Sequence, residues 1–419
     1  MRKNVLIRSV GCRLNQFETD RLRTDLVNYG LKSDRKSLPD ICIINTCTVT
    51  GKADRKSRAL VQQTIRQYPR AFVIVTGCYA HTDAPVFIKM KGVDLVVKND
   101  KKMEMGEVLK DKGIIDPLSG RPSRGLYISD RTRPYIKIQD GCDMNCTYCK
   151  VRIARGKSRS LDLNKVLDTA RRLAERSYPE IVITGVNIGD YRFEGHELAD
   201  LLKEMAGIRD LERIRLTSIE PANINERLLS VLRHEKICPY FHVPLQSGSD
   251  RILKLMNRPY TSSDYARLIE RLQKIKKNVI IGSDVIVGFP GETEEDFHNT
   301  RELLKRLDIF YLHIFKYSPR AGTLAGSFKD NVSQKDKTSR SEYLHRYRDQ
   351  QKAHFFNSLP GQRLNVIVEH KIVDHKFVSA LADNYVPVLL PRRDRKYHRK
   401  IVPVHVIEFK GGHLYARII

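Results

Sequence analysis

The chain has 419 residues, with 75 Lys and Arg against 49 Asp and Glu, which gives a formal net charge of +26. This length is enough for two or three domains with sizeable cores, and the absence of any run of eighteen apolar residues excludes a membrane-spanning helix. An excess of positive charge on this scale argues against an enzyme of small neutral metabolites and indicates a polyanionic partner, most simply a nucleic acid.

The N-terminal residues enter a strand-like run at once, without the apolar core of a signal peptide or the Arg- and Ser-rich pattern of a transit peptide. The eight cysteines, several at metal-ligand spacing, favour reduced thiols over a disulfide framework. We therefore expect a cytoplasmic protein with no membrane anchor.

Three continuous apolar runs in the first hundred residues each lead into a cysteine. These runs are residues 4–11, 40–46 and 71–77, which precede Cys12, Cys47 and Cys78. Helical patterns at 15–29 and 53–67 separate them, and this alternation is typical of a parallel α/β sheet buried on both faces. Because ligands gather at the carboxyl ends of parallel strands, we expect the three thiols to converge and form a metal site. Cys42 and Cys238 are expected to be plain core residues.

Residues 100–132 have the composition of a connection, with dense Lys and Glu followed by a Pro-, Gly- and Ser-rich stretch at 116–123. Beyond it, strand-like and helical segments alternate again. The strand-like segments are 135–138, 180–184, 213–218, 241–244, 279–287 and 310–317, and the helical ones are 163–176, 196–206, 262–276 and 294–307. Six such units predict a partial, open (β/α)6 barrel, whose active face lies at the carboxyl ends of its strands.

Polar and glycine-rich turns follow the second to fifth of these strands. They contain Gly185, Asn187, Ser218, Glu220, Gln246 and Gly288. Glycine lets a backbone approach a ligand closely, and a carboxylate such as Glu220 can accept hydrogen bonds from hydroxyl or amino groups. Each turn alone is a weak signal, but four at one barrel rim indicate a binding site.

A nine-residue loop after the first of these strands, residues 141–149, holds Cys142, Cys146 and Cys149 at the spacing C-x3-C-x2-C. Thiolates this close in a reducing compartment bind a soft metal. Zinc normally takes a second pair of ligands, which the sequence does not offer downstream. Three thiolates suit a four-iron cubane cluster with one iron left open, and a partial zinc site or a chance cluster is the alternative.

The last part of the chain begins with a charged helical pattern at 337–357, followed by five short strand-like segments at 363–369, 377–380, 386–391, 401–407 and 414–418. Short strands at this spacing predict a small β-barrel. Between the third and fourth lies a basic loop that contains Arg392, Arg393, Arg395, Lys396, Tyr397, Arg399 and Lys400. Such a loop suits single-stranded RNA. Arg155 and Lys157, in a second basic segment, could meet phosphate or form a solvated face.

The C-x3-C-x2-C loop, with the aromatic Tyr148 before its last cysteine, resembles the signature of radical S-adenosylmethionine (SAM) enzymes. The resemblance implies that the open iron chelates SAM and that reduction of the cluster cleaves SAM to a 5′-deoxyadenosyl radical. It also implies that Tyr148 and the six rim residues contact SAM.

Longer motifs resemble the methylthiotransferase family within that superfamily. They are residues 11–16, 45–49, 76–80, 241–250, 256–258 and 284–293. The resemblance implies a methylthiotransferase N-terminal domain at 1–113, a radical SAM domain at 127–358 and a TRAM-like RNA-binding barrel at 359–419. It implies that Cys12, Cys47 and Cys78 hold an auxiliary 4Fe–4S cluster, in addition to the SAM-binding cluster on Cys142, Cys146 and Cys149. Lys98 stands where the family more usually has glycine, and Arg152 where it usually has proline.

The implied activity is the conversion of N6-threonylcarbamoyladenosine at position 37 of tRNA to its 2-methylthio derivative. The alternatives are isopentenyladenosine at the same position, an aspartate of a ribosomal protein, and an RNA-binding iron–sulfur sensor without enzymatic activity. The expected partners are the tRNA anticodon stem-loop, an electron donor and a sulfur source, and the enzyme is expected to be a monomer. Beyond the cluster ligands, no catalytic residue is assigned from the sequence.

Overall fold

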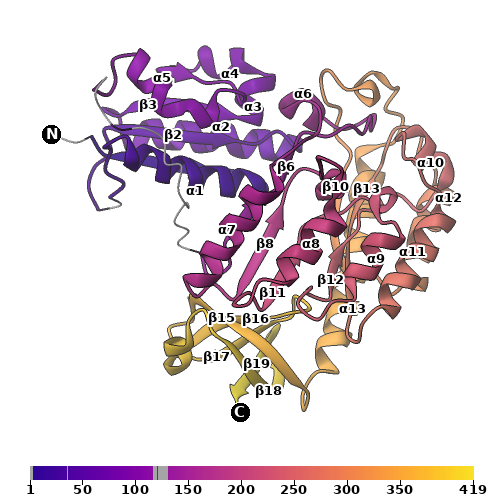
Figure 1. Cartoon of the computed structure of the whole chain (residues 1–419). Helices are drawn as coiled ribbons and strands as arrows, with labels where there is room; N and C mark the ends of the chain where they lie inside the picture. Colours follow the sequence, from indigo (N-terminus) through magenta and orange to yellow (C-terminus); the bar gives the residue numbers. More distant parts are fainter. Residues whose placement is uncertain (1–2, 35, 117–119, 121–130) are drawn as a thin grey trace. The chain divides into compact units, whose positions relative to one another are not determined.

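The computed structural model describes residues 3–34, 36–116, 120 and 131–419 (Figure 1). The chain divides into two compact units. The first comprises Met1–Ser129, Asp140–Arg159 and Arg320–Thr323, and the second Asp130–Gln139, Ser160–Pro319 and Leu324–Ile419. Across the described residues, every helix is too short or too polar to cross a bilayer.

A four-stranded parallel sheet forms the centre of the first unit, with the strand order β1-β2-β3-β4. Its strands are β1 (Val5–Ser9), β2 (Ile41–Thr46), β3 (Phe72–Gly77) and β4 (Leu95–Val96). Alternate residues of β2 face opposite cores: Ile41 and Ile43 pack with α1 (Arg13–Asn28), and Cys42 and Ile44 with α2 (Gly51–Gln67). Burial on both faces explains the unbroken apolar runs and confirms the predicted parallel sheet.

Two further helices of this unit, α3 (Cys78–Thr82) and α4 (Ala84–Ile88), pack with α2. The prediction that residues 100–132 form a plain connection was wrong for its first part. Residues 102–111 form η1 (Lys102–Glu104) and α5 (Met105–Asp111), and Met105 and Leu109 are fully buried in the sheet's core. The charged residues between them hid this apolar stripe. The stretch 116–123, apart from Asp116 and Gly120, lies outside the described residues.

The cysteine loop and helix α6 (Val151–Arg155) also belong to the first unit. The chain reaches this segment through the two-residue strand β6 (Gln139–Asp140) and leaves it through β7 (Arg159–Ser160).

Six parallel strands form the partial barrel of the second unit, in the sheets β11-β8-β5 and β12-β13-β14. They are β5 (Tyr135–Lys137), β8 (Glu180–Thr184), β11 (Arg213–Leu216), β12 (Tyr240–His242), β13 (Ile280–Val287) and β14 (Tyr311–Lys316). A parallel bridge between Ile214 and Ile237 joins the two sheets. The predicted (β/α)6 architecture is therefore confirmed.

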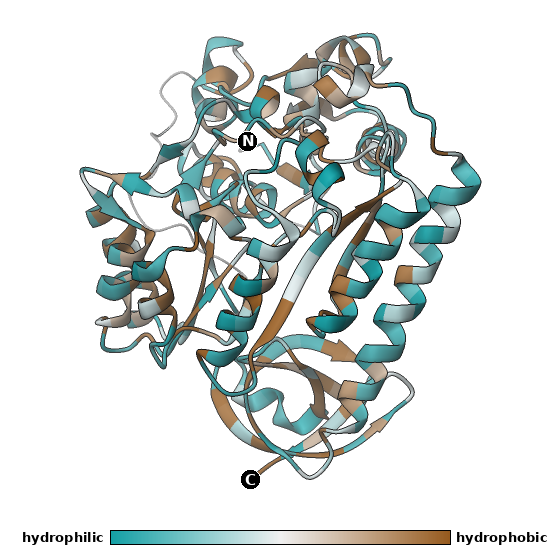
Figure 2. Cartoon of the chain, turned by 90° about the vertical axis from the view of Figure 1, so that its right-hand side faces the viewer, coloured by the Kyte–Doolittle hydropathy of each residue, from teal (hydrophilic) through white to brown (hydrophobic). Residues whose placement is uncertain are grey.

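Helices alternate with these strands, as the 3.6-residue pattern predicted. They are α7 (Leu163–Glu175), α8 (Leu198–Ala206), α9 (Glu226–Leu232), α10 (Asp250–Leu255), α11 (Ser262–Lys274) and α12 (Glu294–Arg306). Short elements fill the turns: η2 (Ile188–Asp190), β9 (Arg192–Phe193), β10 (His196–Glu197), η3 (Pro221–Asn223) and η4 (Leu324–Ser327). Figure 2 colours the strands mainly brown and the flanking helices mainly teal, as expected of helices with one solvated face.

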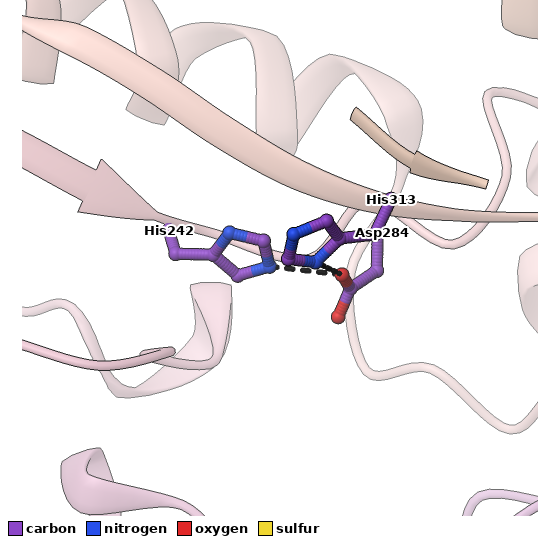
Figure 3. A group of neighbouring side chains, drawn as sticks. All are labelled: His242, Asp284 and His313. Carbon is purple, nitrogen blue, oxygen red and sulfur yellow. Dashed lines mark hydrogen bonds and ion pairs between the residues drawn. The ribbon is translucent and has the colours of Figure 1, made fainter. Parts of the chain in front are cut away.

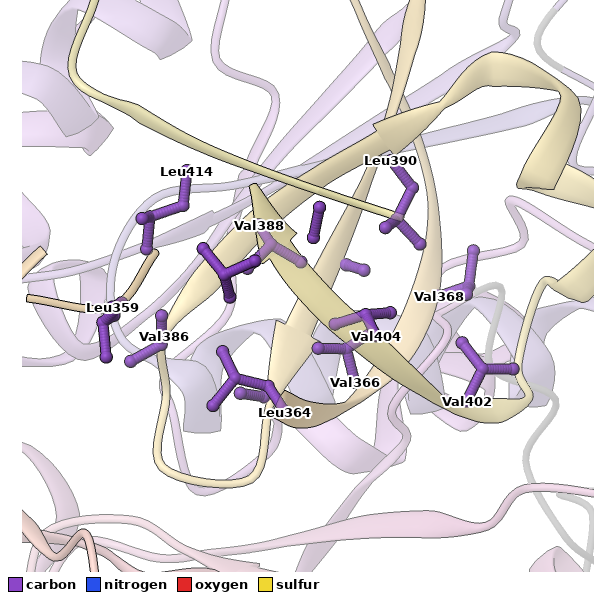
Figure 4. Packing of buried hydrophobic residues seen from close by; sticks show 14 of the residues in the cluster. Leu359, Leu364, Val366, Val368, Val386, Val388, Leu390, Val402, Val404 and Leu414 are labelled. Atoms are coloured by element: carbon purple, nitrogen blue, oxygen red, sulfur yellow. The ribbon is translucent and has the colours of Figure 1, made fainter. Parts of the chain in front are cut away.

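The helix α13 (Gln334–Asn357) leads into a closed five-stranded barrel with the order β15-β16-β17-β19-β18. Its strands are β15 (Arg363–Val373), β16 (Phe377–Ala382), β17 (Pro387–Pro391), β18 (Ile401–Lys410) and β19 (His413–Ile418). Figure 4 shows its valine- and leucine-rich core, which confirms the predicted small barrel. Tyr240 and Ile280 of the partial barrel pack into the same core, and buried Arg215 donates hydrogen bonds to the carbonyl oxygens of Ala382 and Asp383.

Candidate functional site

Cys12, Cys47 and Cys78 each follow one strand of the four-stranded sheet. Cys12 is the N-cap of α1, Cys47 comes directly after β2, and Cys78 is the first residue of α3. Gly11 adopts a φ of +119°, and a Cβ there would lie 2.7 Å from the Sγ of Cys47. The chain before Cys12 therefore touches Cys47, although 35 positions separate the two cysteines in the sequence.

Side-chain hydrogen bonds join the ends of the three strands. The Nδ2 of Asn15 donates to the carbonyl oxygen of Thr46 at 3.0 Å, and the Oγ1 of Thr46 donates to that of Thr76 at 2.6 Å. The Oγ of Ser57 accepts the backbone N–H of Cys47 at 3.1 Å. These groups are buried, so the strand ends are held as one rigid edge.

The three thiols influence one another electrostatically, as neighbouring groups do. Burial raises the pKa of Cys47 to about 12, and the sulfurs of Cys12 and Cys78 add to the increase. Burial also raises the pKa of Cys78, which the cations Arg155 and Lys102 oppose. Metal binding needs deprotonated thiols, and a cluster brings the positive iron charge that would favour them. Three thiols at neighbouring strand ends, which influence one another's pKa values and lie beside two cations, offer a donor set that fits an iron–sulfur cluster.

A buried ionic cluster lies beside Cys78. Glu18 accepts hydrogen bonds from Arg155, at 2.8 Å and 3.0 Å, and from the Nζ of Lys102 at 2.5 Å. Arg155 also donates to the Oδ1 of Asn15 at 2.7 Å and to Asp140 at 3.0 Å. Its side chain is only 3% exposed, so the structure does not support the prediction that Arg155 contacts RNA. Arg155 instead joins the cysteine loop to α1.

Cys142, Cys146 and Cys149 are half-buried in their loop. The loop is closed by a hydrogen bond from the N–H of Cys142 to the carbonyl oxygen of Gly156 at 3.1 Å. The N–H of Val151 points at the Sγ of Cys149, at 3.4 Å, and such N–H···S contacts stabilise thiolates in iron–sulfur sites. Tyr148 is half-buried in the same loop. These three sulfurs fit the donor set of the SAM-binding cluster.

The predicted SAM-binding residues of the second unit all follow carboxyl ends of barrel strands. Gln139, the first residue of β6, accepts hydrogen bonds from the N–H groups of Val186 and Asn187, both at 3.0 Å. The side chain of Asn187 donates to Asn223 at 2.9 Å. Gly185 lies against Gln139, since a Cβ there would come within 3.0 Å of its carbonyl oxygen. These contacts form a hydrogen-bonded turn at the rim.

The remaining rim residues differ in how accessible they are. Glu220 forms an ion pair with Arg258, and Ser218 is half-buried. Gln246 is buried, with a φ of +67°, and donates its N–H to the carbonyl oxygen of Asp284. Gly288 faces Lys337, because a Cβ there would lie 2.2 Å from its side chain. Packing against α13 therefore explains this glycine without a ligand.

One cluster on the barrel strands was not predicted from the sequence. The Oδ1 of Asp284, on β13, lies 2.9 Å from the Nε2 of His242 and 3.0 Å from the Nδ1 of His313 (Figure 3). His242 belongs to β12 and His313 to β14. Burial alone would raise the pKa of Asp284, but the two imidazoles outweigh it and hold that pKa well below its usual range. The sequence signal that could have revealed the cluster is one polar, ligand-type residue inside each of three strand-like runs.

The basic residues of the C-terminal barrel are mostly accessible. Arg392–Tyr397 form the 3-10 helix η5. The exposed members are Arg392, Arg393, Arg395, Lys396 and Lys400. Tyr397 packs partly against the barrel core, and Arg399 lies over the ring of Tyr178 at 4.3 Å. Lys157, in the first unit, is exposed.

Two family models match the chain. Residues 136–304 match the radical SAM superfamily, and residues 4–98 match a family described as uncharacterized protein family UPF0004. Among solved structures, the radical SAM methyltransferase TsrM from Kitasatospora setae has a TM-score of 0.60 at 16% identity, covering 78% of this chain and 77% of that one. This likeness concerns the fold alone.

Curated relatives are similar over nearly the whole chain. The threonylcarbamoyladenosine tRNA methylthiotransferase MtaB of Aquifex aeolicus is 36% identical, over 92% of this chain and 98% of its own length. The protein of the same name from Bacillus subtilis is 34% identical, over 98% and 95%. The tRNA-2-methylthio-N(6)-dimethylallyladenosine synthase of Endomicrobium trichonymphae is 30% identical, over 99% and 100%. The chain therefore belongs to the radical SAM methylthiotransferase family, whose members use SAM and a 4Fe–4S cluster.

Proposed function

We propose that this protein methylthiolates tRNA, converting the C2–H of N6-threonylcarbamoyladenosine at position 37 to C2–S–CH3. Two relatives named for threonylcarbamoyladenosine are 36% and 34% identical to this chain, and two relatives named for dimethylallyladenosine are 30% identical. In this proposal one 4Fe–4S cluster is held by Cys142, Cys146 and Cys149, and an auxiliary 4Fe–4S cluster by Cys12, Cys47 and Cys78.

The observation that carries the proposal is the gathering of the second cysteine set at the edge of the sheet. Generating a radical from SAM needs only the three cysteines of the C-x3-C-x2-C loop. Cys12, Cys47 and Cys78 come from three separate strand ends, and the pKa of Cys47 responds to both other thiols. A second cluster with an open iron suits a reaction that inserts sulfur.

The chemistry explains why such cofactors are needed. An aromatic C–H bond is not acidic enough for a protein side chain to remove its proton, and the bound cofactors supply radical chemistry in its place. The chain's own part is positioning. Gly11 leaves room at the Cys47 sulfur, and the N–H of Val151 supports the Cys149 sulfur. Arg258 orients the carboxylate of Glu220 at the barrel rim.

For SAM we propose contacts with residues of the barrel rim and of the cysteine loop. Gly288 is left out because it packs on Lys337. The retained residues are Tyr148, Gly185, Asn187, Ser218, Glu220 and Gln246.

For the tRNA anticodon stem-loop we propose an electrostatic surface on the C-terminal barrel, in the role of a TRAM-like module. Its members are Arg392, Arg393, Arg395, Lys396 and Lys400, whose exposure leaves their charges available to phosphates. Lys157 is a further candidate, whereas Tyr397 and Arg399 are partly occupied by the protein itself. Turnover also needs an electron donor and a sulfur source. A tRNA substrate and eight free cysteines fit work in the cytoplasm.

The test is nucleoside mass spectrometry of tRNA from cells that lack the gene and then regain it. The wild-type gene should restore 2-methylthio-N6-threonylcarbamoyladenosine, and a Cys12→Ala, Cys47→Ala, Cys78→Ala variant should not. Anaerobically purified wild-type protein should hold about eight irons per chain, and that variant about four. Restoration of the isopentenyl derivative would assign the alternative substrate. Four irons in the wild-type protein would remove the auxiliary cluster.

A further inference from the structure

His242, Asp284 and His313 lie on the concave face of the partial barrel. Successive side chains of a strand point to opposite faces. Ser283, next to Asp284, bonds to Tyr265 of the outer helix α11 at 3.2 Å. Asp284 therefore points away from the helices, as Figure 3 shows it pointing toward the two imidazoles. His313 is its register partner on β14.

A layer of aromatic rings lies below this cluster. Tyr240, two residues before His242 on β12, stacks on Tyr385 of the C-terminal barrel with centroids 4.5 Å apart. Tyr311, two residues before His313, meets Tyr240 edge to face at 5.8 Å. The tyrosines close the amino-terminal end of the barrel interior, so the cluster is reached from the carboxyl-end side, where substrates of barrel enzymes bind.

The shared carboxylate oxygen fixes how both imidazoles are oriented. Because Asp284 Oδ1 accepts from each ring, the hydrogens lie on His242 Nε2 and His313 Nδ1; this assignment follows from the hydrogen-bond network. In a neutral imidazole the other nitrogen is then an acceptor. The His242 side chain is 6% exposed, but that of His313 is 64% exposed. In its neutral form His313 therefore presents Nε2 as an accessible acceptor on a fixed ring.

Metal binding is the competing interpretation of this cluster, because two histidines and one carboxylate are also a common set of metal ligands. Histidines that bind metals almost always donate their second ring N–H to a carboxylate, a backbone carbonyl or a water molecule. His242 is buried, with a side chain only 6% exposed, and in the part of the chain that the structure describes its Nδ1 has no such hydrogen bond to a protein group. The cluster is thus better suited to a ligand whose own N–H or O–H group donates a hydrogen bond to it.

We propose that His313, held by Asp284, accepts a hydrogen bond from an N–H or O–H group on the N6 substituent of the target adenosine. This inference rests on the proposed function and assigns the substrate preference to a residue. A threonylcarbamoyl substituent carries N–H and O–H donors, whereas an isopentenyl substituent is a hydrocarbon and carries none. An acceptor at His313 would therefore favour the first substrate over the second. Asp284 and His242 act as positioning residues.

Two substitutions of His313 separate recognition from simple bracing. His313→Asn keeps a donor near Nδ1 that can still bond Asp284, but has no group at the Nε2 position. His313→Gln reaches the Nε2 position with an acceptor oxygen but loses the bond to Asp284. If His313 recognises the substituent, His313→Asn is the more damaging change. If His313 only holds Asp284 in place, His313→Gln is the more damaging change.

The assay uses cluster-loaded full-length protein and two synthetic anticodon stem-loops of one sequence, with threonylcarbamoyl or isopentenyl at the target N6. Product and 5′-deoxyadenosine are both measured. We expect His313→Asn to lower kcat/KM about ten- to a hundredfold on the first RNA only. We also expect more 5′-deoxyadenosine per product, since a misplaced base still permits SAM cleavage. His313→Gln should retain part of the preference.

Equal losses on both RNAs, or wild-type behaviour of His313→Asn, would overturn the inference while leaving the methylthiotransferase assignment intact. One equivalent of Zn²⁺ bound by wild-type protein and not by Asp284→Asn would also overturn it, in favour of a metal centre. Wild-type protein that modifies neither RNA would overturn the proposed function together with this inference.

Discussion

Replacing Glu18 with glutamine should loosen the first unit more than any exposed charge substitution. The Glu18 side chain is 2% exposed and is the common partner of Arg155 and Lys102, whose side chains are 3% and 1% exposed. The amide keeps the shape and one acceptor but removes the negative charge. Arg155 would then keep its ion pair with Asp140, whereas Lys102 would keep its hydrogen bond to the amide oxygen of Asn99.

The size of the effect follows from this arrangement. Removing one partner of a buried ion pair destabilises proteins by about 3–5 kcal/mol. Asp140 and Asn15 still bond Arg155, so we expect a value near the lower end, about 3 kcal/mol. Because the chain has two units, a single unfolding free energy is not well defined for it. Hydrogen exchange with mass spectrometry is the suitable assay, and protection should fall in peptides from α1 and α6.

Two variants make this prediction refutable. Glu18→Gln combined with Lys102→Met removes the second cation and should recover part of the protection. Glu302→Gln breaks an exposed pair with Lys305 and should exchange like the wild type. Unchanged exchange in Glu18→Gln, or a double variant less protected than the single one, would refute the view that Glu18 neutralises a buried charge.

Three further predictions concern other parts of the chain. Arg215→Met leaves Glu180 fully buried without its 2.6 Å partner and should destabilise the packing of the C-terminal barrel by about 3 kcal/mol, seen as faster exchange in β16. Gly11→Ala, whose Cβ would meet the Cys47 sulfur, should lower iron content from about eight to about four per chain, whereas Gly30→Ala, with a similar positive φ and open space, should not. The exposed cations of the basic loop to be replaced with alanine are Arg392, Arg393, Arg395 and Lys396. Each replacement should weaken tRNA binding. The negative slope of log K against log salt should become shallower by about 0.7–0.9 for each phosphate that is no longer neutralised.

Most of the framework could be predicted from the sequence because its signals are local. A buried parallel strand is a continuous apolar run, and a turn with glycine ends it. Residues 180–184 were predicted as a strand and form β8 with the same bounds. The burial of Cys42 and Cys238 was predicted from their apolar neighbours and is confirmed. The helix α5 escaped because its two core residues, Met105 and Leu109, stand among charged ones.

Partnerships between distant side chains had no such local signal. Arg155 and Glu18 are 137 positions apart, and Asp284 and His242 are 42 apart. A sequence shows that each residue is charged or polar, but only the fold shows that they meet. Arg155 was therefore grouped with solvated basic residues, and the His242–Asp284–His313 cluster was not predicted.

The buried cations also change how the net charge of +26 is interpreted. Arg155, Lys102, Arg215 and Lys337 are each at most 3% exposed in their side chains and each has a carboxylate partner. When Asp140 is counted beside Glu18, the carboxylates balance these four cations, so the buried ion pairs contribute little attraction for a polyanion. The attraction must come from cations at the surface, such as those of the basic loop, whose partners include backbone and imidazole groups and not only carboxylates. The salt dependence of tRNA binding should therefore respond to Arg392 and Arg395 but not to Lys337, and an equal response to Lys337→Met would contradict this division of the charge.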